Sequence, residues 1–260
     1  MGIAHAGVVE WITARHPELG ESWLLPVVAE TWDGRLNEIN RQHLTTAHVI
    51  EALDSAMAGP VPEGSVGGGT GMVCYGFKGG NGSASRLVRH GEQDYAVGVF
   101  VQANFGRRPD LTIAGRHVGP MFPVDPEPAP GAGSVIVVIA TDAPMLPDQC
   151  RALARRATIG LARTGTFGSH TSGDLFLAFS TANAAGFSPA ADALHGARRP
   201  LDRLEFVPWS GINPFFEAVV QGTEEAVLNA LVANEAMTGH RGVHVPALAR
   251  DEIAALFHRE

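Results

Sequence analysis

The sequence predicts a layered α/β or α+β fold in a single domain. Predicted strands and helices alternate along the chain, and two long amphipathic helices, at 147–164 and 213–235, are suited to covering the faces of a sheet. The strand expected at 134–140 is apolar at every position, so we expect both of its faces to be covered. A chain of 260 residues with 45% hydrophobic side chains is long enough to bury such a core.

Caps, turn residues and hydrophobic periodicity define each element in turn. The helix expected at 45–57 begins at a threonine cap and places Val49, Leu53 and Met57 on one face. The helix at 147–164 has a proline in its first turn, and the last helix begins with asparagine and proline. The expected elements are helices at 8–15 and 45–57, strands at 86–89, 95–102, 111–114 and 134–140, a helix at 147–164, a strand at 174–181 and a helix at 213–235.

Composition and charge exclude several classes of protein. A net charge of −8 without a long basic run argues against nucleic acid as a main partner. The two cysteines, Cys74 and Cys150, are too few for a disulfide framework, fit no zinc motif and are expected to be buried and reduced. No apolar stretch is long enough to span a membrane, and the first residues lack the pattern of a signal peptide. We therefore expect a cytoplasmic protein without membrane partners.

The common catalytic motifs are absent. In the glycine-rich segment 64–82, Lys78 follows Phe77 and precedes Gly79, so no phosphate loop is formed. Met72 occupies the place of the third glycine of a dinucleotide-binding fingerprint, and no G-x-S-x-G sequence occurs. The 11 histidines form no H-E-x-x-H pair. Ordinary nucleotide, metal and hydrolase chemistries are therefore disfavoured, and no cofactor or metal is expected.

Two segments are not explained by folding alone. The first is the glycine-rich segment, whose backbone amides can approach a bound group closely. The second is 168–174, Gly-Ser-His-Thr-Ser-Gly-Asp, which precedes an apolar strand. One interpretation of this second segment is a connection made of turn-forming residues. The other is a self-processing site, in which cleavage before Ser172 would make that serine the first residue of a new chain.

These segments belong to a longer pattern that resembles the DmpA-type family of aminopeptidases. This family includes L-aminopeptidase/D-amino-acid esterases and β-peptidyl aminopeptidases. The matching stretches, in order along nearly the whole chain, are VVAETWDGRLN at 27–37, GPVPEGSVGGGTGMVCYGFKGGNGSASR at 59–86, VQANFG at 101–106, VVIATDAPMLPDQ at 137–149, ARTG at 162–165, SGDLFLAFSTAN at 172–183 and NPFFEAVVQGTEEAVLNAL at 213–231.

The resemblance implies a fold, a processing event and an assembly. The fold would be an αββα four-layer sandwich like that of ornithine acetyltransferase and N-terminal-nucleophile hydrolases. The precursor would cleave itself between Thr171 and Ser172, giving chains 1–171 and 172–260 that form tetramers of two-chain units. The resemblance also implies a further segment before VVAETWDG, which this sequence does not contain, so one alternative to a self-processing aminopeptidase is an inactive, truncated family member that acts as a binding or scaffold protein. A second alternative is an aminoacyl transferase, because the same acyl-enzyme could pass its acyl group to an amine.

The chemistry of a terminal serine fits these residues, because no Ser-His-Asp triad is evident. A freed Ser172 would carry an α-amine beside its hydroxyl. With a reference pKa of about 7.7–8.0, roughly one such amine in ten is neutral at pH 7 and can accept a proton. The same hydroxyl would first attack the carbonyl of Thr171. The expected substrates are short peptides, amino-acid amides or esters with a free amino terminus.

Further residues are assigned roles around this serine. Asn104 is either a hydrogen-bond donor to the oxyanion or a turn residue after its strand. The resemblance implies that Tyr75 polarises the substrate or holds its amine, whereas the alternative is a half-buried strand aromatic. It also implies that Ser210 helps to position the nucleophile, although no acidic residue follows it closely.

The substrate-binding groups are expected in the glycine-rich segment, at Gly69, Thr70 and Gly71. Asp142 either lines the same cavity or caps the turn after its strand. Asp174 either orients the new chain terminus or bonds to amides of its turn. The remaining carboxylates have structural interpretations: Glu63 lies in a turn, and Glu224 and Glu225 form a pair on a helix face.

Overall fold

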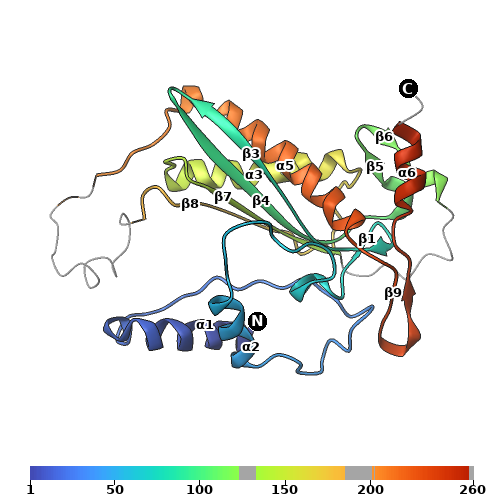
Figure 1. The fold of residues 1–260 in the computed structure, drawn as a ribbon, viewed down its shortest axis with the longest axis horizontal. Helices are drawn as coiled ribbons and strands as arrows, with labels where there is room; N and C mark the ends of the chain where they lie inside the picture. The colour runs from blue at the N-terminus through green and yellow to red at the C-terminus, as the bar shows by residue number, and fades with distance from the viewer. Residues whose placement is uncertain (123–132, 185–200, 202, 258–260) are drawn as a thin grey trace.

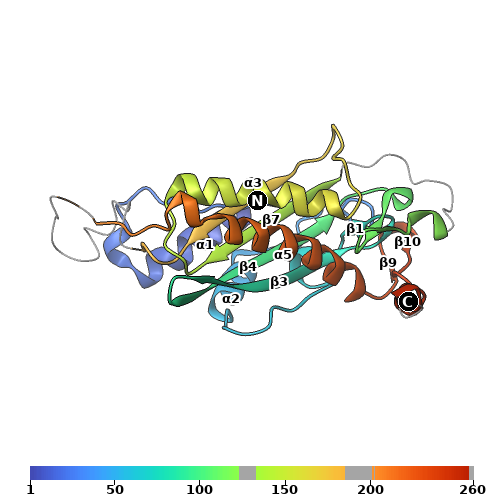
Figure 2. The same ribbon diagram turned by 90° about the horizontal axis from the view of Figure 1, so that it is seen from above.

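The protein is built on a four-stranded sheet with two long helices on one face (Figures 1 and 2). The computed structural model describes residues 1–122, 133–184, 201 and 203–257. The strand order is β3-β4-β7-β8. β3 and β4 form an antiparallel hairpin, β4 pairs antiparallel with β7, and β7 pairs in parallel with β8. The bounds are Gly80–His90 for β3, Gln93–Asn104 for β4, Ser134–Thr141 for β7 and Leu175–Ser180 for β8.

The helical layer consists of α3 (Pro147–Arg163) and α5 (Asn213–Val232). α3 provides the crossover that two parallel neighbouring strands require, and it leads from β7 to β8. α5 lies very close to β3, because a Cβ atom at Gly82 would be only 1.9 Å from the carbonyl oxygen of Ala226. A Cβ atom at Gly160 of α3 would similarly lie 2.6 Å from Thr223 of α5. Glycines therefore set how closely α5 approaches β3 and how closely α3 approaches α5.

The N-terminal region forms a separate helical pair. α1 (Gly2–Arg15) packs on α2 (Thr46–Asp54), with Gly7 in contact with Val49. Figure 1 shows the pair below the sheet, on the side away from α3 and α5. The shorter elements are η1 (Pro17–Leu19), η2 (Gly67–Gly69), β1 (Val73–Cys74), β2 (Phe77–Lys78), η3 (Arg108–Asp110), β5 (Thr112–Ile113), β6 (Arg116–His117), η4 (Gly119–Met121), η5 (Trp209–Gly211), β9 (Met237–Thr238), η6 (His240–Gly242), β10 (His244–Val245) and α6 (Arg250–Phe257).

The face of β8 away from the helices is more exposed than its apolar sequence predicts. Leu175, Leu177 and Phe179 are 50%, 42% and 43% exposed, whereas the alternate residues Phe176 and Ala178 pack against the core. The expectation that β7 is covered on both faces is also wrong, since its residues alternate between buried and half-buried. An apolar run indicates what a strand is able to bury. It does not establish that another layer covers both faces.

The mixed α/β class is confirmed, and most expected elements are present. The described residues form one helical layer and one larger sheet, which are two of the four layers of an αββα sandwich. β3 begins at Gly80, six residues before the expected strand, because its first half is rich in glycine and serine and lacks apolar alternation. No helix in the described ranges is long and apolar enough to cross a membrane. Both cysteines are buried and unpaired.

Candidate active site

Ser172 lies in the connection between α3 and β8, three residues before the first residue of this edge strand. Its amide N–H donates to the carbonyl oxygen of Ser169 at 2.9 Å, so His170 and Thr171 occupy the centre of a β-turn. The Thr171–Ser172 bond is part of this turn. The side-chain hydroxyl of Ser172 donates a hydrogen bond to Asp174 Oδ1. The serine is half-buried, and the residues on either side of it are exposed.

The segment is fixed to the sheet immediately after Ser172. The amide of Gly173 donates to the carbonyl oxygen of Gly133, which directly precedes β7, at 3.2 Å. Ser134, the first residue of β7, is the register partner of Asn104, the last residue of β4. Parallel pairing of β7 and β8 therefore places Ser172 at the same end of the sheet as Asn104.

The side chain of Asn104 joins three separate parts of the chain. Its Nδ2 donates to the carbonyl oxygen of Trp32 at 2.6 Å, and its Oδ1 accepts from the amide of Val73 at 2.9 Å. Asn104 is only 5% exposed. The stretch around Trp32 is further tied to β7, because its amide donates to the hydroxyl of Ser134 at 3.1 Å. Both polar groups of the Asn104 amide thus bind backbone atoms.

The glycine-rich segment lies at this same end of the sheet. A Cβ atom at Gly68 would collide with Gln102 near the end of β4, and one at Gly71 would lie 2.7 Å from Asp33. Gly69 and Gly71 are buried, whereas Thr70 is exposed, with its hydroxyl donating to the carbonyl oxygen of Gly67 at 2.8 Å. Within the described residues, the amides of Gly67 and Gly68, two exposed residues, donate no hydrogen bond. Such amides are available to a bound oxyanion or carboxylate.

Lys78 holds the glycine-rich segment in place from inside the protein. The side chain is completely buried, and its Nζ donates to the carbonyl oxygens of Gly69 and Met72, each at 3.2 Å, and of Gly79 at 2.6 Å. Burial lowers the pKa of Lys78 from 10.5 to about 8. The sequence interpretation considered this lysine only as a phosphate ligand. The sequence signal for its structural role is a lysine within a glycine-rich stretch that contains no acidic residue to pair with it.

Tyr75 lies in the core, behind this end of the sheet. It shares the turn between β1 and β2 with Gly76, and both residues have positive φ, of 52° and 71°, as a tight hairpin turn requires. Its amide donates to the carbonyl oxygen of Phe105, and its hydroxyl is hydrogen-bonded to Thr164 Oγ1 at 2.7 Å. The side chain is fully buried, which raises the pKa of Tyr75 above its usual range.

Asp142 and Ser210 lie at the opposite end of the sheet from Ser172. Asp142 follows the last residue of β7, where its Oδ1 accepts from the amide of Ala96 at 2.8 Å. Ser210 lies in η5 before α5, and its neighbour Gly211 packs against His90 at the tip of the β3–β4 hairpin. β7 has eight residues and separates these ends by roughly 25 Å. The structure therefore does not bring these two residues together with Ser172.

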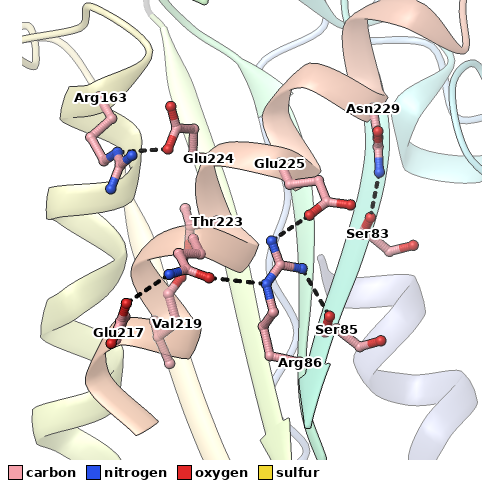
Figure 3. Close-up of polar contacts among 11 residues, drawn as sticks. Ser83, Ser85, Arg86, Arg163, Glu217, Val219, Thr223, Glu224, Glu225 and Asn229 are labelled. Carbon is pink, nitrogen blue, oxygen red and sulfur yellow. Dashed lines mark hydrogen bonds and ion pairs between the residues drawn. The ribbon is translucent and has the colours of Figure 1, made fainter. Parts of the chain in front are cut away.

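The remaining carboxylates form structural contacts. Glu224 pairs with Arg163 of α3, and Glu225 pairs with Arg86 of β3, each at 2.6 Å (Figure 3). Glu63 Oε1 accepts from the amide and the hydroxyl of Ser83, at 2.7 and 2.9 Å. These contacts agree with the structural interpretations of the three residues, because they tie α5 and the 59–64 turn to neighbouring elements. No group of three histidine, cysteine or acidic residues in the described ranges is arranged to hold a metal.

The fold and this end of the sheet define a mixed α/β protein with a serine before an edge strand. Two solved structures share this fold. The chain is 42% identical to an L-aminopeptidase D-Ala-esterase/amidase from Ochrobactrum anthropi, described as a variant of the Ntn hydrolase fold and a prototype of the serine aminopeptidases. The TM-score is 0.87, with 99% of this chain and 70% of that chain covered. A β-aminopeptidase from Burkholderia sp. gives a TM-score of 0.88 at 42% identity, with the same coverage.

Residues 1–245 match the model of peptidase family S58, and the chain belongs to that family. It is 44% identical over 275 residues to the β-peptidyl aminopeptidase BapA of Sphingosinicella microcystinivorans, covering 100% of this chain and 67% of that protein. It is 43% identical over 272 residues to BapA of Sphingosinicella xenopeptidilytica, covering 98% and 65%. The predicted resemblance to DmpA-type aminopeptidases is confirmed. The chain spans about two thirds of the length of these curated relatives.

Proposed function

We propose that the protein is a self-processing serine aminopeptidase that removes N-terminal residues from short peptides, amino-acid amides or esters. The observation that carries this proposal is the position of Ser172. Its hydroxyl is hydrogen-bonded in a turn before an edge strand, at the end of the sheet that also holds Asn104 and the glycine-rich segment. Membership of a peptidase family and similarity to proteins named as aminopeptidases support the peptidase activity.

Processing would divide the chain into residues 1–171 and 172–260. The second fragment would remain bound, because its strand β8 pairs with β7 and its helix α5 packs on β3 and α3. Phe215, Val219, Val227 and Leu231 of α5 are completely buried. Burial of such side chains contributes about 1.5–3 kcal/mol each, which is ample to hold a fragment without a covalent link. We further propose that these two-chain units assemble into tetramers in the cytoplasm.

In the processed protein, the α-amine of Ser172 would serve as the base that activates its own hydroxyl. The amides of the exposed residues Gly67 and Gly68 are suited to stabilise the oxyanion, since they have no competing acceptor in the described part of the chain. Gly69, Thr70 and Gly71 would line the substrate position beside them. Asn104 Nδ2 uses one of its two hydrogens on the carbonyl oxygen of Trp32, and the second hydrogen would donate to an oxyanion. Tyr75 would have to act on the substrate from the core, and Ser210 and Asp142 would have to act from the opposite end of the sheet.

The substitution Ser172→Ala tests the proposal. We expect this variant to remain one chain of 27.4 kDa and to hydrolyse no aminoacyl amide, because both nucleophile and processing are removed. Intact mass under denaturing conditions and release of a chromogenic amine are the measurements. Ser55→Ala, an exposed serine at the end of α2, is the matched control and should behave as the wild type. Normal splitting of Ser172→Ala would exclude Ser172 as the processing nucleophile.

A further inference from the structure

The uncut chain needs a proton acceptor that Ser172 itself does not contain. Before cleavage, the nitrogen of Ser172 belongs to the Thr171–Ser172 amide, and its N–H donates to the carbonyl oxygen of Ser169. It therefore has no amine to act as a base. We propose that Asp174 is the general base of the self-cleavage step. This inference rests on the proposed function of Ser172 and assigns to a second residue the first reaction of the precursor.

The geometry places Asp174 where this reaction requires it. Its Oδ1 accepts the hydrogen bond from the Ser172 hydroxyl, so the proton to be removed already points at a carboxylate. Gly173, between the two residues, is anchored by its amide to the start of β7. Within the described residues, Asp174 has no ion-pair partner that would compete for its oxygens. His170, the other titratable side chain of the turn, makes no described hydrogen bond to Ser172.

The proposed step conserves atoms and charge. Asp174 Oδ1 takes the hydroxyl proton while Ser172 Oγ forms a bond to the carbonyl carbon of Thr171, whose π electrons move to its oxygen. When this tetrahedral intermediate collapses, the carbon–nitrogen bond breaks, and the proton on Asp174 passes to the departing nitrogen. That nitrogen becomes the neutral α-amine of Ser172. Water then hydrolyses the Thr171–Ser172 ester to the carboxylic acid of Thr171 and the restored hydroxyl.

The base would thus change during maturation. Asp174 acts while Ser172 is an internal residue, and the new α-amine acts afterwards, so the carboxylate is catalytic in processing and not in turnover. This division allows the inference to fail while the proposed function stands. The rate of chain splitting in an Asp174 variant tests Asp174 as the general base. The absence of splitting in Ser172→Ala tests Ser172 as the nucleophile.

The test follows the splitting of the full-length chain during and after cell-free translation, by denaturing gel and intact mass. We expect Asp174→Asn, which keeps the size of the side chain, to split at least about 100-fold more slowly than the wild type. His170→Gln is the matched control in the same turn and should split at the wild-type rate. Wild-type splitting of Asp174→Asn, with Ser172→Ala uncut, would overturn the inference and leave the proposed function intact.

Replacing the Ser172 hydroxyl by a thiol shows whether the Asp174 carboxylate acts as a general base or only positions the turn. A cysteine ionises near pH 8.5 without help, so Ser172→Cys needs a base less than the wild type does. We expect the ratio of splitting rates with and without the Asp174 carboxylate to fall toward one in the Ser172→Cys background at pH 9. In the serine background it should stay large at the same pH. An equal ratio in both backgrounds would assign Asp174 to positioning alone and contradict the proposal.

Discussion

Lys78 is the single lysine of the chain, and the structure buries it completely among backbone carbonyls. Its ammonium group satisfies the carbonyl oxygens of Gly69, Met72 and Gly79, which lie on both sides of the β1–β2 hairpin. Because the side chain is fully buried, it cannot rotate away from these carbonyl oxygens into solvent. The conformation of the glycine-rich segment, and hence the direction of its exposed amides, depends on this one side chain.

The low pKa of Lys78 makes stability depend on pH in an alkaline window. Between about pH 8 and 10.5 the amine is neutral in the folded protein and protonated in the unfolded chain, so the unfolded state binds more protons. The free energy of unfolding should therefore gain up to about 3 kcal/mol from this group as the pH rises through the window.

Because the chain has one lysine, ¹⁵N-lysine labelling gives one side-chain signal whose titration can be followed directly. We expect a midpoint near 8 in the folded protein, and we expect Lys78→Met to lose the pH-dependent gain in urea-unfolding experiments. A midpoint above 10 would show that the carbonyl contacts outweigh desolvation.

At the scale of elements, the contact between β3 and α5 is set by a glycine. An alanine at Gly82 would force its Cβ to within 1.9 Å of the Ala226 carbonyl oxygen, and backbone atoms on both elements would have to move apart. We expect Gly82→Ala to lower the free energy of unfolding by about 2–4 kcal/mol. Gly98 of β4 offers a matched control, since its nearest neighbour to a Cβ is 3.8 Å away. Urea denaturation of both variants measures the difference, and equal stability would contradict the packing described.

Local signals in the sequence predicted these elements well. The Asn-Pro start and apolar face of α5 and the apolar run of β7 depend only on neighbouring residues, and the structure has α5 at Asn213–Val232 and β7 at Ser134–Thr141. β1 and β2 have two residues each and pair with each other across a tight turn, which is too short for an apolar pattern to indicate. Their place in the fold depends on long-range contacts, such as the Lys78 amide with the carbonyl oxygen of Pro246.

Sequence motifs placed only some of the site residues at the correct end of the sheet. Motifs identified Ser172, Asn104 and the glycine-rich segment, and the structure has all three at one end of the sheet. Motifs carry no topology, however. Because β7 and β8 are parallel, residues before β8 lie beside residues before β7, and Asp142, which follows β7, lies at the far end. The sequence did not indicate that Lys78 holds the glycine-rich segment, because its amine binds backbone carbonyl oxygens, which every residue carries.

At the scale of the whole molecule, the segments on either side of Ser172 share one core. Residues after it supply the edge strand and the helix that cover β7, β4 and β3, so cleavage of one bond in an exposed turn leaves these layers in contact. We expect fragments 1–171 and 172–260 to elute together in native size-exclusion chromatography and to separate only in denaturant. Independent elution of the fragments in native buffer would show that the core does not hold them.

The central claim is that Ser172 becomes the first residue of a new chain, and N-terminal sequencing combined with denaturing intact mass tests it most directly. Purified protein that hydrolyses aminoacyl amides should give two polypeptides, the second beginning Ser-Gly-Asp-Leu-Phe. A single active species of 27.4 kDa with Met1 as its one amino terminus would contradict the account.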